Sequence, residues 1–250
     1  MSDPLFDVSG KSIVIAGACG GLGSAIARML GERGAHLTLT DRDHAALEKL
    51  SDTIAGKVAC FEINVVDETD TIAVLQSASD TYGGIDVLIN ATGAFVTGPA
   101  DQLAAEDFRH TLDVNTTGAF LLSRAAAKHM SSAGGSIVHI ASVSSIVANP
   151  NYAAYATSKA ALSQLVRVLA REWAPQNIRV NAIGPAMTET PLTTAHLAGN
   201  SFRDQALSVI PMGRLGQPED LLGTILLLCT SGGNYITGQT IYVDGGRTLV

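Results

Sequence analysis

Tyr155 and Lys159 are the first pair of residues whose types and spacing could do chemistry, and both lie in the stretch "NPNYAAYATSKAAL", Asn149 to Leu162. On a helix, residues four apart lie on one face, one turn apart. An ammonium group held beside a phenol favours the phenolate and lowers the pKa of the phenol. The pair is therefore either part of an ordinary helix surface or part of a proton-transfer site, and the rest of the sequence decides between the two.

A glycine-rich turn follows the first apolar run of the chain. Gly17, Gly21 and Gly23 in "AGACGGLGSAIA" form the pattern G-x-x-x-G-x-G between an expected strand and an expected helix. Glycine lets the backbone turn sharply and approach a ligand, and the N-terminus of the following helix offers free N–H groups. The pattern suits a pyrophosphate, although it differs from the G-x-G-x-x-G fingerprint of dinucleotide sites. A plain glycine-rich turn is the alternative.

Asp41 lies at the end of the second expected strand, where an acid can hydrogen-bond the ribose hydroxyls of NAD. Its charge would also repel the additional phosphate of NADP. Arg42 is the opposing signal, because an arginine can bind that phosphate. Capping of the next helix is the alternative role for Asp41, but Asp43 is a comparable candidate for that role.

Composition excludes several classes of function. The formal net charge is −7 and no stretch is rich in Lys or Arg, so we expect no nucleic-acid or membrane partner. Cys19, Cys60 and Cys229 are scattered and the histidines lack metal-binding spacing, so we expect neither disulfides nor a metal site. The first residues show no signal-peptide pattern, and the longest apolar run is too short to span a bilayer. These features predict a soluble protein of a reducing compartment, the cytoplasm.

Expected strands alternate with expected helices along the 250 residues. Apolar runs predict strands at 12–17, 36–41, 58–64, 86–91, 135–142, 178–185 and 238–246. Amphipathic runs predict helices at 24–34, 43–54, 67–82, 104–130 and 218–230, and a further helix that the stretch containing Tyr155 enters. This order predicts a doubly wound α/β fold, a seven-stranded parallel sheet with helices on both faces. We expect one domain over 1–250, with the irregular segment at about 188–215 as a lid over the substrate.

Two further polar residues lie where chemistry is expected. Ser142 is at the C-terminal end of the fifth expected strand, the edge at which open α/β sheets bind ligands. Asn115, in "LDVNTTGAF", is a polar residue among apolar ones within the helical run 104–130. Together with the glycine-rich turn, these positions make an ordinary helix surface the weaker interpretation of Tyr155 and Lys159.

From the first strand to the C-terminus, the sequence resembles the short-chain dehydrogenase/reductase family, of the single-domain type with a Rossmann fold. "AGACGGLG" is similar to the family's T-G-x-x-x-G-x-G, "NATG" to N-N-A-G, "GPAMTETP" to P-G-x-x-x-T and "GQTIYVDGG" to the last strand, and Y-x-x-x-K is intact. Each motif alone is weak, but their order along the chain is specific. The resemblance implies an NAD(H)-dependent oxidoreductase that interconverts a secondary alcohol and a ketone, and it implies a homotetramer.

The resemblance also implies roles for individual residues. Tyr155 is the expected general acid/base, and Ser142 is expected to hold the substrate oxygen. Lys159 is expected to lower the pKa of Tyr155 and to bind the nicotinamide ribose, while Asn115 holds a water that relays the proton. The implied cofactor-binding residues are Gly17, Cys19, Gly20, Gly21, Leu22, Gly23, Asp41, Arg42, Asn64, Val65, Asn90, Ala91, Gly93, Tyr155, Lys159, Pro185, Ala186, Thr188 and Thr190. The implied substrate-binding residues are Phe95, Ser142, Val143, Asn149, Tyr152, Tyr155, Met187, Leu192 and His196.

The sequence departs from the family motifs at few positions. Ala186 replaces the glycine after Pro185, close to the expected nicotinamide. Gly20 stands where NADP-dependent relatives often carry an arginine. Together with Asp41, this glycine favours NAD as the cofactor.

Two alternative functions belong to classes other than alcohol dehydrogenases. One is a catalytically silent NAD-binding regulator or scaffold on the same fold, against which the intact set of Asn, Ser, Tyr and Lys argues. The other is an isomerase or dehydratase that recycles its cofactor, against which the short chain argues. Arg203 is the only arginine or lysine in 192–207, and none stands ready for a substrate carboxylate or phosphate. We therefore expect a modest, mainly neutral substrate such as a polyol, a hydroxyacyl group, or a cyclic or aryl alcohol.

Overall fold

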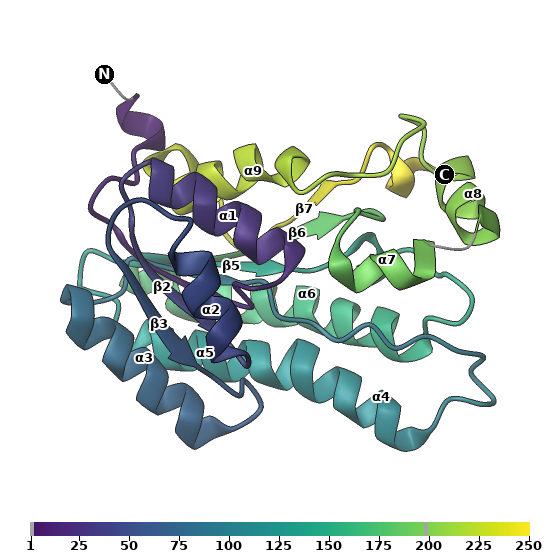
Figure 1. The fold of residues 1–250 in the computed structure, drawn as a ribbon, viewed down its shortest axis with the longest axis horizontal. Coiled ribbons are helices and arrows are strands. Elements are labelled where there is room, and N and C mark those ends of the chain that lie inside the picture. Colours follow the sequence, from purple (N-terminus) through teal and green to yellow (C-terminus); the bar gives the residue numbers. More distant parts are fainter. Residues whose placement is uncertain (1–2, 198–199) are drawn as a thin grey trace.

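The computed structural model describes residues 3–197 and 200–250, and its centre is a parallel sheet between two layers of helices (Figure 1). The seven strands of this sheet lie in the order β3-β2-β1-β4-β5-β6-β7. Their bounds are β1 Ser12–Ala16, β2 His36–Asp41, β3 Val58–Glu62, β4 Val87–Asn90, β5 Gly135–Ile140, β6 Ile178–Pro185 and β7 Thr240–Val243. The predicted doubly wound, seven-stranded parallel sheet is confirmed.

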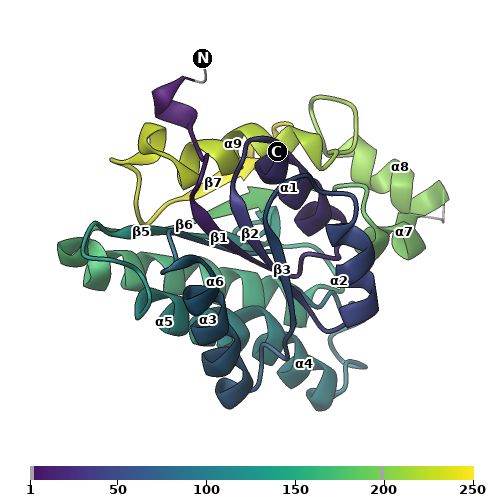
Figure 2. The same cartoon turned by 60° about the vertical axis from the view of Figure 1, so that its left-hand side comes forward.

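Helices cover both faces of the sheet (Figures 1 and 2). One layer holds α1 (Gly21–Glu32), α2 (His44–Ser51) and α9 (Glu219–Cys229), and the other holds α3 (Glu68–Tyr82), α4 (Ala105–Leu112), α5 (Gly118–Ala127) and α6 (Ala153–Trp173). Alternate side chains of a strand point to opposite faces. Accordingly, Ile13 and Ile15 of β1 belong to the core under α1 and α9, whereas Val14 belongs to the core under α3, α5 and α6.

The strand order reverses between β1 and β4, and the reversal opens a crevice at the C-terminal ends of these strands. Gly17 follows β1 and Ala91 follows β4, and the two backbones touch there. A Cβ on Gly17 would lie only 2.8 Å from the carbonyl carbon of Ala91. Gly17 also has a φ of +77°, a region that favours glycine. The glycine therefore allows the two strand ends to approach each other.

The predicted long helix 104–130 is interrupted. The segment consists of α4, a π-helical stretch Asp113–Thr117, and α5. Asn115 lies in the π-helical stretch, and its side chain hydrogen-bonds Ala94 and Ser158 from two neighbouring segments. Irregular turns of this kind often occur at functional sites. The regular helical period of the sequence does not indicate this stretch or its contacts with distant residues.

Two other predicted segments differ from the structure. The segment 188–215 is not irregular throughout, since it contains α7 (Pro191–Leu197) and α8 (Asn200–Ser208). The stretch around Tyr155 becomes helical only at Ala153, where α6 begins, and Asn151 before it has a φ of +70°. Asparagine tolerates this left-handed conformation better than most residues.

Residues 3–197 and 200–250 were compared with the expectations for membrane spans, metal sites and disulfides. No helix there is long and apolar enough to cross a membrane. No group of three or more His, Cys, Asp or Glu side chains in this part could hold a metal ion. Cys19, Cys60 and Cys229 are all free thiols.

Candidate active site

A cavity of about 1120 Å³ lies at the C-terminal edge of the sheet, where the loops that follow the strands meet. Most of the predicted site residues line it, namely Gly17, Gly20, Gly21, Leu22, Gly23, Asp41, Arg42, Asn64, Val65, Ala91, Gly93, Phe95, Ser142, Val143, Asn149, Tyr152, Tyr155, Lys159, Pro185, Ala186, Met187, Thr188, Thr190 and Leu192. Cys19, Asn90 and Asn115 are not among the lining residues of the described part. The side chain of His196 lies outside the described residues.

The glycine-rich turn (17–23) forms one wall of the cavity. A Cβ on Gly23 would lie 2.1 Å from the carbonyl oxygen of Gly17, so the turn can close only with glycine there. Helix α1 begins at Gly21 and has Gly20 as its N-cap, with no side-chain hydrogen bond to the first N–H groups. Free N–H groups at a helix N-terminus bind phosphate groups well.

Asp41 joins the end of β2 to the glycine-rich turn. Its Oδ2 accepts a hydrogen bond from Cys19 N at 3.0 Å, and its Oδ1 accepts one from Arg42 N at 2.8 Å. Asp43, not Asp41, caps α2, because Asp43 Oδ1 accepts from Ala46 N at 3.0 Å. Each carboxylate oxygen of Asp41 retains acceptor capacity for a ligand hydroxyl.

Tyr155 and Lys159 lie one turn apart on α6 and both line the cavity, beside Ser142. The ammonium of Lys159 donates to Ile140 O, at the end of β5, at 2.7 Å, and its side chain is only 4% exposed. Ser142 lies just after the end of β5 and accepts a hydrogen bond from Ser144 N at 3.1 Å. The end of β5 and the first turns of α6 therefore bring a phenol, an ammonium group and a hydroxyl to one place.

Burial shifts the pKa values of Tyr155 and Lys159. Burial raises the pKa of Tyr155 to about 12, and the hydrogen bond with Ser142 opposes that rise. Burial lowers the pKa of Lys159 to about 8. The expectation that Lys159 lowers the pKa of Tyr155 is therefore not met by the protein groups alone. The cost of burying the phenolate is the largest effect on the pKa of Tyr155, and the neighbouring Tyr152 adds to the rise.

Asn115 is 2% exposed, and protein groups occupy most of the hydrogen-bonding positions of its side-chain amide. Its Nδ2 donates to Ala94 O and to Ser158 Oγ, both at 2.9 Å. Its Oδ1 accepts from Ala94 N at 2.8 Å. A Cβ on Gly93 would lie 3.5 Å from Asn115 Oδ1 and 3.8 Å from Lys159 Nζ. Asn115 thus lies directly behind the cavity wall, at the place where Gly93 faces Lys159.

Asn90 also lies behind the wall, in a buried polar network. Its Nδ2 lies 3.2 Å from Nδ1 of His139, and its Oδ1 accepts from Thr92 N at 3.1 Å. His139 is completely buried on β5, and its Nε2 lies 3.0 Å from Ser123 Oγ. Burial and the charge of Lys159 lower the pKa of His139 to about 3, so this imidazole is neutral at neutral pH.

Aromatic rings line the predicted substrate end of the cavity. Phe95 packs edge-on against Tyr155 and Tyr152, with ring centroids 4.7 and 5.3 Å apart. Apolar surface on the cavity wall also comes from Val143, Met187 and Leu192. Tyr155 therefore lies at a largely apolar part of the cavity wall.

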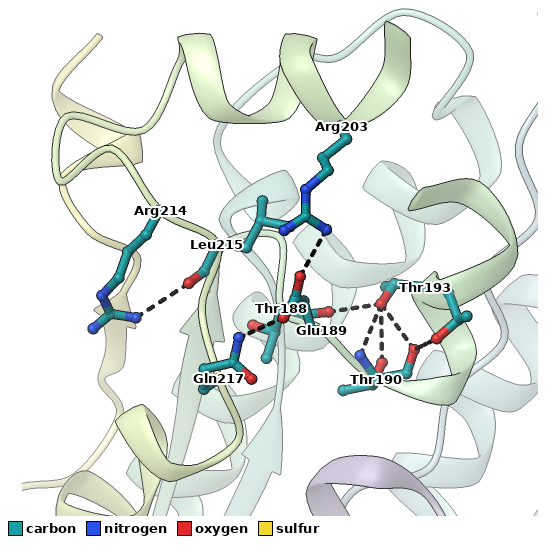
Figure 3. Close-up of polar contacts among 9 residues, drawn as sticks. Thr188, Glu189, Thr190, Thr193, Arg203, Arg214, Leu215 and Gln217 are labelled. Carbon is teal, nitrogen blue, oxygen red and sulfur yellow. Dashed lines mark hydrogen bonds and ion pairs between the residues drawn. The ribbon is translucent and has the colours of Figure 1, made fainter. Parts of the chain in front are cut away.

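The loop from β6 into α7 is stiffened by its own threonines (Figure 3). Thr193 Oγ1 donates to Thr188 O at 2.6 Å and accepts from Thr190 N at 3.1 Å. Next to them, Glu189 pairs with Arg203 at 2.8 Å and accepts from Gln217 Nε2 at 2.6 Å. Arg203 is therefore held by Glu189, and it is not among the described residues that line the cavity.

Sequence reasoning missed several lining residues. They are Ile63, Val66, Thr92, Ala94, Thr97, His110, Val114, Ile140, Ala141, Ser144 and Arg247. The other lining residues come from segments that the sequence predicted for the substrate, Pro150 and Asn151 from 147–152 and Thr193, Phe202, Gln205, Ala206, Val209 and Ile210 from the predicted lid at 188–215. Arg247 matters most, because it places a guanidinium group on the cavity wall at a position for which the sequence predicted no role. No local pattern around "RTLV" indicates a site, since the fold alone brings Arg247 beside Asn149.

Residues 17–248 match the family model described as "Enoyl-(Acyl carrier protein) reductase". The chain is 34% identical over 249 residues to 3beta-hydroxysteroid dehydrogenase 1 of Eggerthella lenta, with 97% of this chain and 95% of the relative covered. It is also similar to the crystal structure of a short-chain type dehydrogenase/reductase from Mycobacterium marinum. That similarity has a TM-score of 0.92 at 33% identity and covers 98% of each chain.

A further solved structure comes from Beutenbergia cavernae and contains bound NADP at low occupancy. The protein is provisionally described as an NAD(P)-dependent gluconate 5-dehydrogenase. The TM-score is 0.90 at 33% identity, and the similarity covers 98% of this chain and all of that one. The names of the Eggerthella lenta and Beutenbergia cavernae proteins indicate different substrates.

Proposed function

The chain belongs to the short-chain dehydrogenase/reductase family, and we propose that it uses NAD(H) to interconvert a secondary alcohol and a ketone with Tyr155 as general acid/base. One observation carries the proposal. Tyr155 and Lys159 lie one turn apart in the cavity that the glycine-rich turn also lines, with Ser142 beside them. A cofactor site and a proton-transfer site thus share one space.

The residues present fit a nicotinamide dinucleotide. The glycine-rich turn leaves no room for a Cβ at Gly17 or Gly23, and the uncapped start of α1 faces the cavity. A bound nicotinamide would supply the redox chemistry, as the acceptor of a hydride with both electrons from the alcohol carbon or as its donor to the ketone carbon. Asp41 and the glycine-rich turn would hold the adenosine part and its phosphates, and Thr188 and Thr190 the nicotinamide part.

NAD is the proposed cofactor because of the residues at the end of β2. The carboxylate of Asp41 is fixed by two backbone N–H groups, so it would meet the 2′-phosphate of NADP with a negative charge. Gly20 offers no side chain to bind that phosphate. Arg42 lines the same cavity and supports the alternative, as does the NADP bound to the Beutenbergia cavernae structure.

The proton moves between Tyr155 and the substrate oxygen in this proposal. In ketone reduction the phenol Oη–H donates its proton as the new alcohol forms, and in alcohol oxidation the phenolate accepts the hydroxyl proton. A pKa of about 12 keeps the phenol of Tyr155 protonated at neutral pH, which suits the reduction. Lys159 and the positive nicotinamide of the oxidised cofactor act in the opposite direction and favour the phenolate. Ser142 holds the substrate oxygen in line with the phenol.

Asn115 has a positioning role in the proposal. Its hydrogen bonds hold the Ala94 backbone and Ser158 of α6, and so fix the distance between the Gly93 loop and the helix that carries Tyr155 and Lys159. One lone pair of Oδ1 remains to bind the water that the family resemblance implies. Lys159 would pass a proton to that water and would bind the ribose.

The direct experiment follows nicotinamide reduction with NAD⁺ or NADP⁺ and a panel of secondary alcohols at mildly alkaline pH. We expect reduction of NAD⁺, and Tyr155→Phe should lower the rate by roughly a thousandfold or more while cofactor binding stays near normal. Tyr235→Phe removes the same hydroxyl from a fully exposed tyrosine and serves as the matched control. Retained turnover in Tyr155→Phe would refute the assignment. Cofactor binding without turnover of any substrate would favour the silent regulator.

A further inference from the structure

We infer that Arg247, together with Asn149, forms an anion-binding subsite that selects substrates carrying a carboxylate. The inference rests on the proposed function, since it names the substrate class of that same cavity. Arg247 lines the cavity with Tyr155 and Ser142, although it lies near the end of the chain. The expected mainly neutral substrate therefore becomes a hydroxy acid, which is oxidised to an oxo acid as its hydride passes to the cofactor and its hydroxyl proton to Tyr155.

The loop after β7 fixes the position of Arg247. Asp244 closes this loop, because its Oδ1 accepts from Gly246 N at 3.0 Å and its Oδ2 accepts from Thr248 N at 2.8 Å. Arg247 N in turn donates to Asp244 O at 3.1 Å. The backbone on both sides of Arg247 is thus tied to one carboxylate.

Glycines let this loop pack closely against the end of the 188–215 segment. Gly245 and Gly246 have φ values of +59° and +89°. A Cβ on Gly245 would lie 2.9 Å from Ile210 Cγ2, and a Cβ on Gly246 would lie 3.0 Å from Pro211 Cγ. The backbone that carries Arg247 is therefore held in place before a substrate binds, which reduces the cost of ordering the side chain on binding.

The guanidinium group of Arg247 has two oxygen partners. Its Nη2 donates to Asn149 Oδ1 at 3.1 Å, and its Nη1 donates to Val250 O at 3.0 Å. Val250 is the last residue of the 250-residue sequence and is 71% exposed, so a substrate carboxylate would replace one solvent-exposed carboxylate oxygen on Nη1 by another. Asn149 can meanwhile stay in place and hold the other side of the guanidinium.

No acidic side chain occupies Arg247 in the described part of the chain. Three other arginines differ in this respect, since each pairs with an Asp or Glu side chain: Arg124, Arg203 and Arg214. The guanidinium of Arg247 can therefore accept an acidic group from a substrate without breaking an ion pair with an Asp or Glu.

The charges around the cavity favour the same conclusion. Among the described lining residues, Asp41 is the only Asp or Glu. Asp41 ends β2 and Arg247 follows β7, and these strands lie toward opposite edges of the sheet. An anionic substrate group at Arg247 would therefore meet a fixed positive charge far from the carboxylate of Asp41.

Asn149 connects the subsite to the reacting group. It lies in the loop that leads from Ser142 at the end of β5 to α6, which carries Tyr155. A guanidinium group matches a carboxylate with two parallel hydrogen bonds, and the Asn149 amide can orient the guanidinium while its Nδ2 remains able to donate. A substrate with its hydroxyl at Ser142 and Tyr155 would then extend its carboxylate toward Arg247.

The test compares hydroxy carboxylates of about four to six carbons with their methyl esters, using the wild-type protein and Arg247→Met. We expect the wild type to prefer the acids, and Arg247→Met to lower kcat/KM for the acids by roughly 10- to 100-fold, mainly through KM. The esters should change by less than about threefold, and Arg247→Lys should restore part of the preference. Arg203→Met, which removes an arginine held by Glu189, is the matched control and should leave the acid-to-ester ratio unchanged.

Binding measurements separate this inference from the proposed function. Calorimetric titration of the same acids and esters into the protein with NADH should show tighter binding of the acids, lost in Arg247→Met, whether or not turnover occurs. Equal binding of acid and ester, or an acid preference that survives in Arg247→Met, overturns the subsite. A preference for the corresponding phosphate esters over the acids overturns the carboxylate assignment. Failure of the proposed function would appear instead as wild-type turnover that Tyr155→Phe does not reduce.

Discussion

The ammonium nitrogen of Lys159 lies 5.7 Å from the centroid of the Tyr155 ring. Its short hydrogen bond to the carbonyl oxygen of Ile140 anchors it to the end of β5. A positive charge is thus held near the phenol by the backbone. The partner that anchors the Lys159 ammonium group is a carbonyl oxygen, so this contact does not depend on the ionisation of an Asp or Glu.

Lys159 should make stability depend on pH in alkaline solution. Its pKa is about 8 in the folded protein against an ordinary value of 10.5. Between these values the unfolded chain holds a proton that the folded protein has lost, so the contribution of Lys159 to the free energy of unfolding should rise with pH, by on the order of 1 kcal/mol per pH unit. The raised pKa values of Cys19 and Cys229 act in the opposite direction above about pH 9, so this contribution is the difference in slope between wild type and Lys159→Met. Urea denaturation of the wild type and Lys159→Met across this range of pH measures the slope.

The variant should lack this rise, whatever its overall stability. Lys128→Met removes an exposed lysine and is the control, for which the wild-type slope should persist. At higher pH, Tyr155 acts in the opposite direction, because its raised pKa means that the unfolded chain loses its proton first. An identical slope in Lys159→Met and wild type would contradict the prediction.

His139 should contribute to unfolding in acid. Its pKa is about 3 in the folded protein against an ordinary value of 6.5, because burial and then the charge of Lys159 disfavour the imidazolium. Between these two values the unfolded chain binds a proton that the folded protein does not, so stability falls as pH falls. His139→Gln should flatten this part of the stability curve, and the exposed His44→Gln should not. Denaturant titrations at several acidic pH values give the slopes.

Asp41 should set the choice between NAD and NADP. Asp41→Ala removes the charge that would repel the 2′-phosphate, so we expect the ratio of kcat/KM for NADP⁺ to that for NAD⁺ to rise by roughly tenfold or more. Asp43→Ala removes a neighbouring acid that caps α2, and should cost only about 1 kcal/mol of stability without changing the ratio. An unchanged ratio in Asp41→Ala would assign the preference to other residues.

Gly23 should tolerate no side chain. A Cβ there would lie 2.1 Å from Gly17 O, a backbone atom that cannot move aside without opening the glycine-rich turn. Gly23→Ala should therefore weaken cofactor binding by about a hundredfold or more and lower stability. Gly223→Ala is the matched control, because nothing lies within 4 Å of its added Cβ and it lies inside α9. That control should bind cofactor normally and be equally or more stable.

Much of the fold could be predicted from the sequence because it depends on local patterns. The apolar runs of β2 and β6 indicated the strand bounds without error, and the amphipathic period placed α3 within one residue at its start. The four-residue spacing of Tyr155 and Lys159 needs only a helix to bring them together. The glycines of the turn are required by its local geometry.

Other features depend on contacts between distant residues. The π-helical stretch around Asn115 exists beside Ala94 and Ser158, and helical periodicity does not encode such contacts. The helices α7 and α8 lie in a segment whose composition suggested a loop. Arg247 and Asn149 are separated by 98 positions, and only the folded chain brings them into hydrogen-bonding distance.

By itself, the sequence determined the parallel sheet, the glycine-rich turn and the pairing of Tyr155 with Lys159, because each follows from the geometry of a short stretch of chain. The tertiary structure decided the protonation of that pair and the character of the substrate end. Burial, which exists only in the folded chain, raises the pKa of Tyr155 to about 12 and lowers that of Lys159 to about 8. The fold likewise brings the charge of Arg247 to the cavity wall. The effect of this charge on a ligand depends on the distance in space, which the sequence does not give.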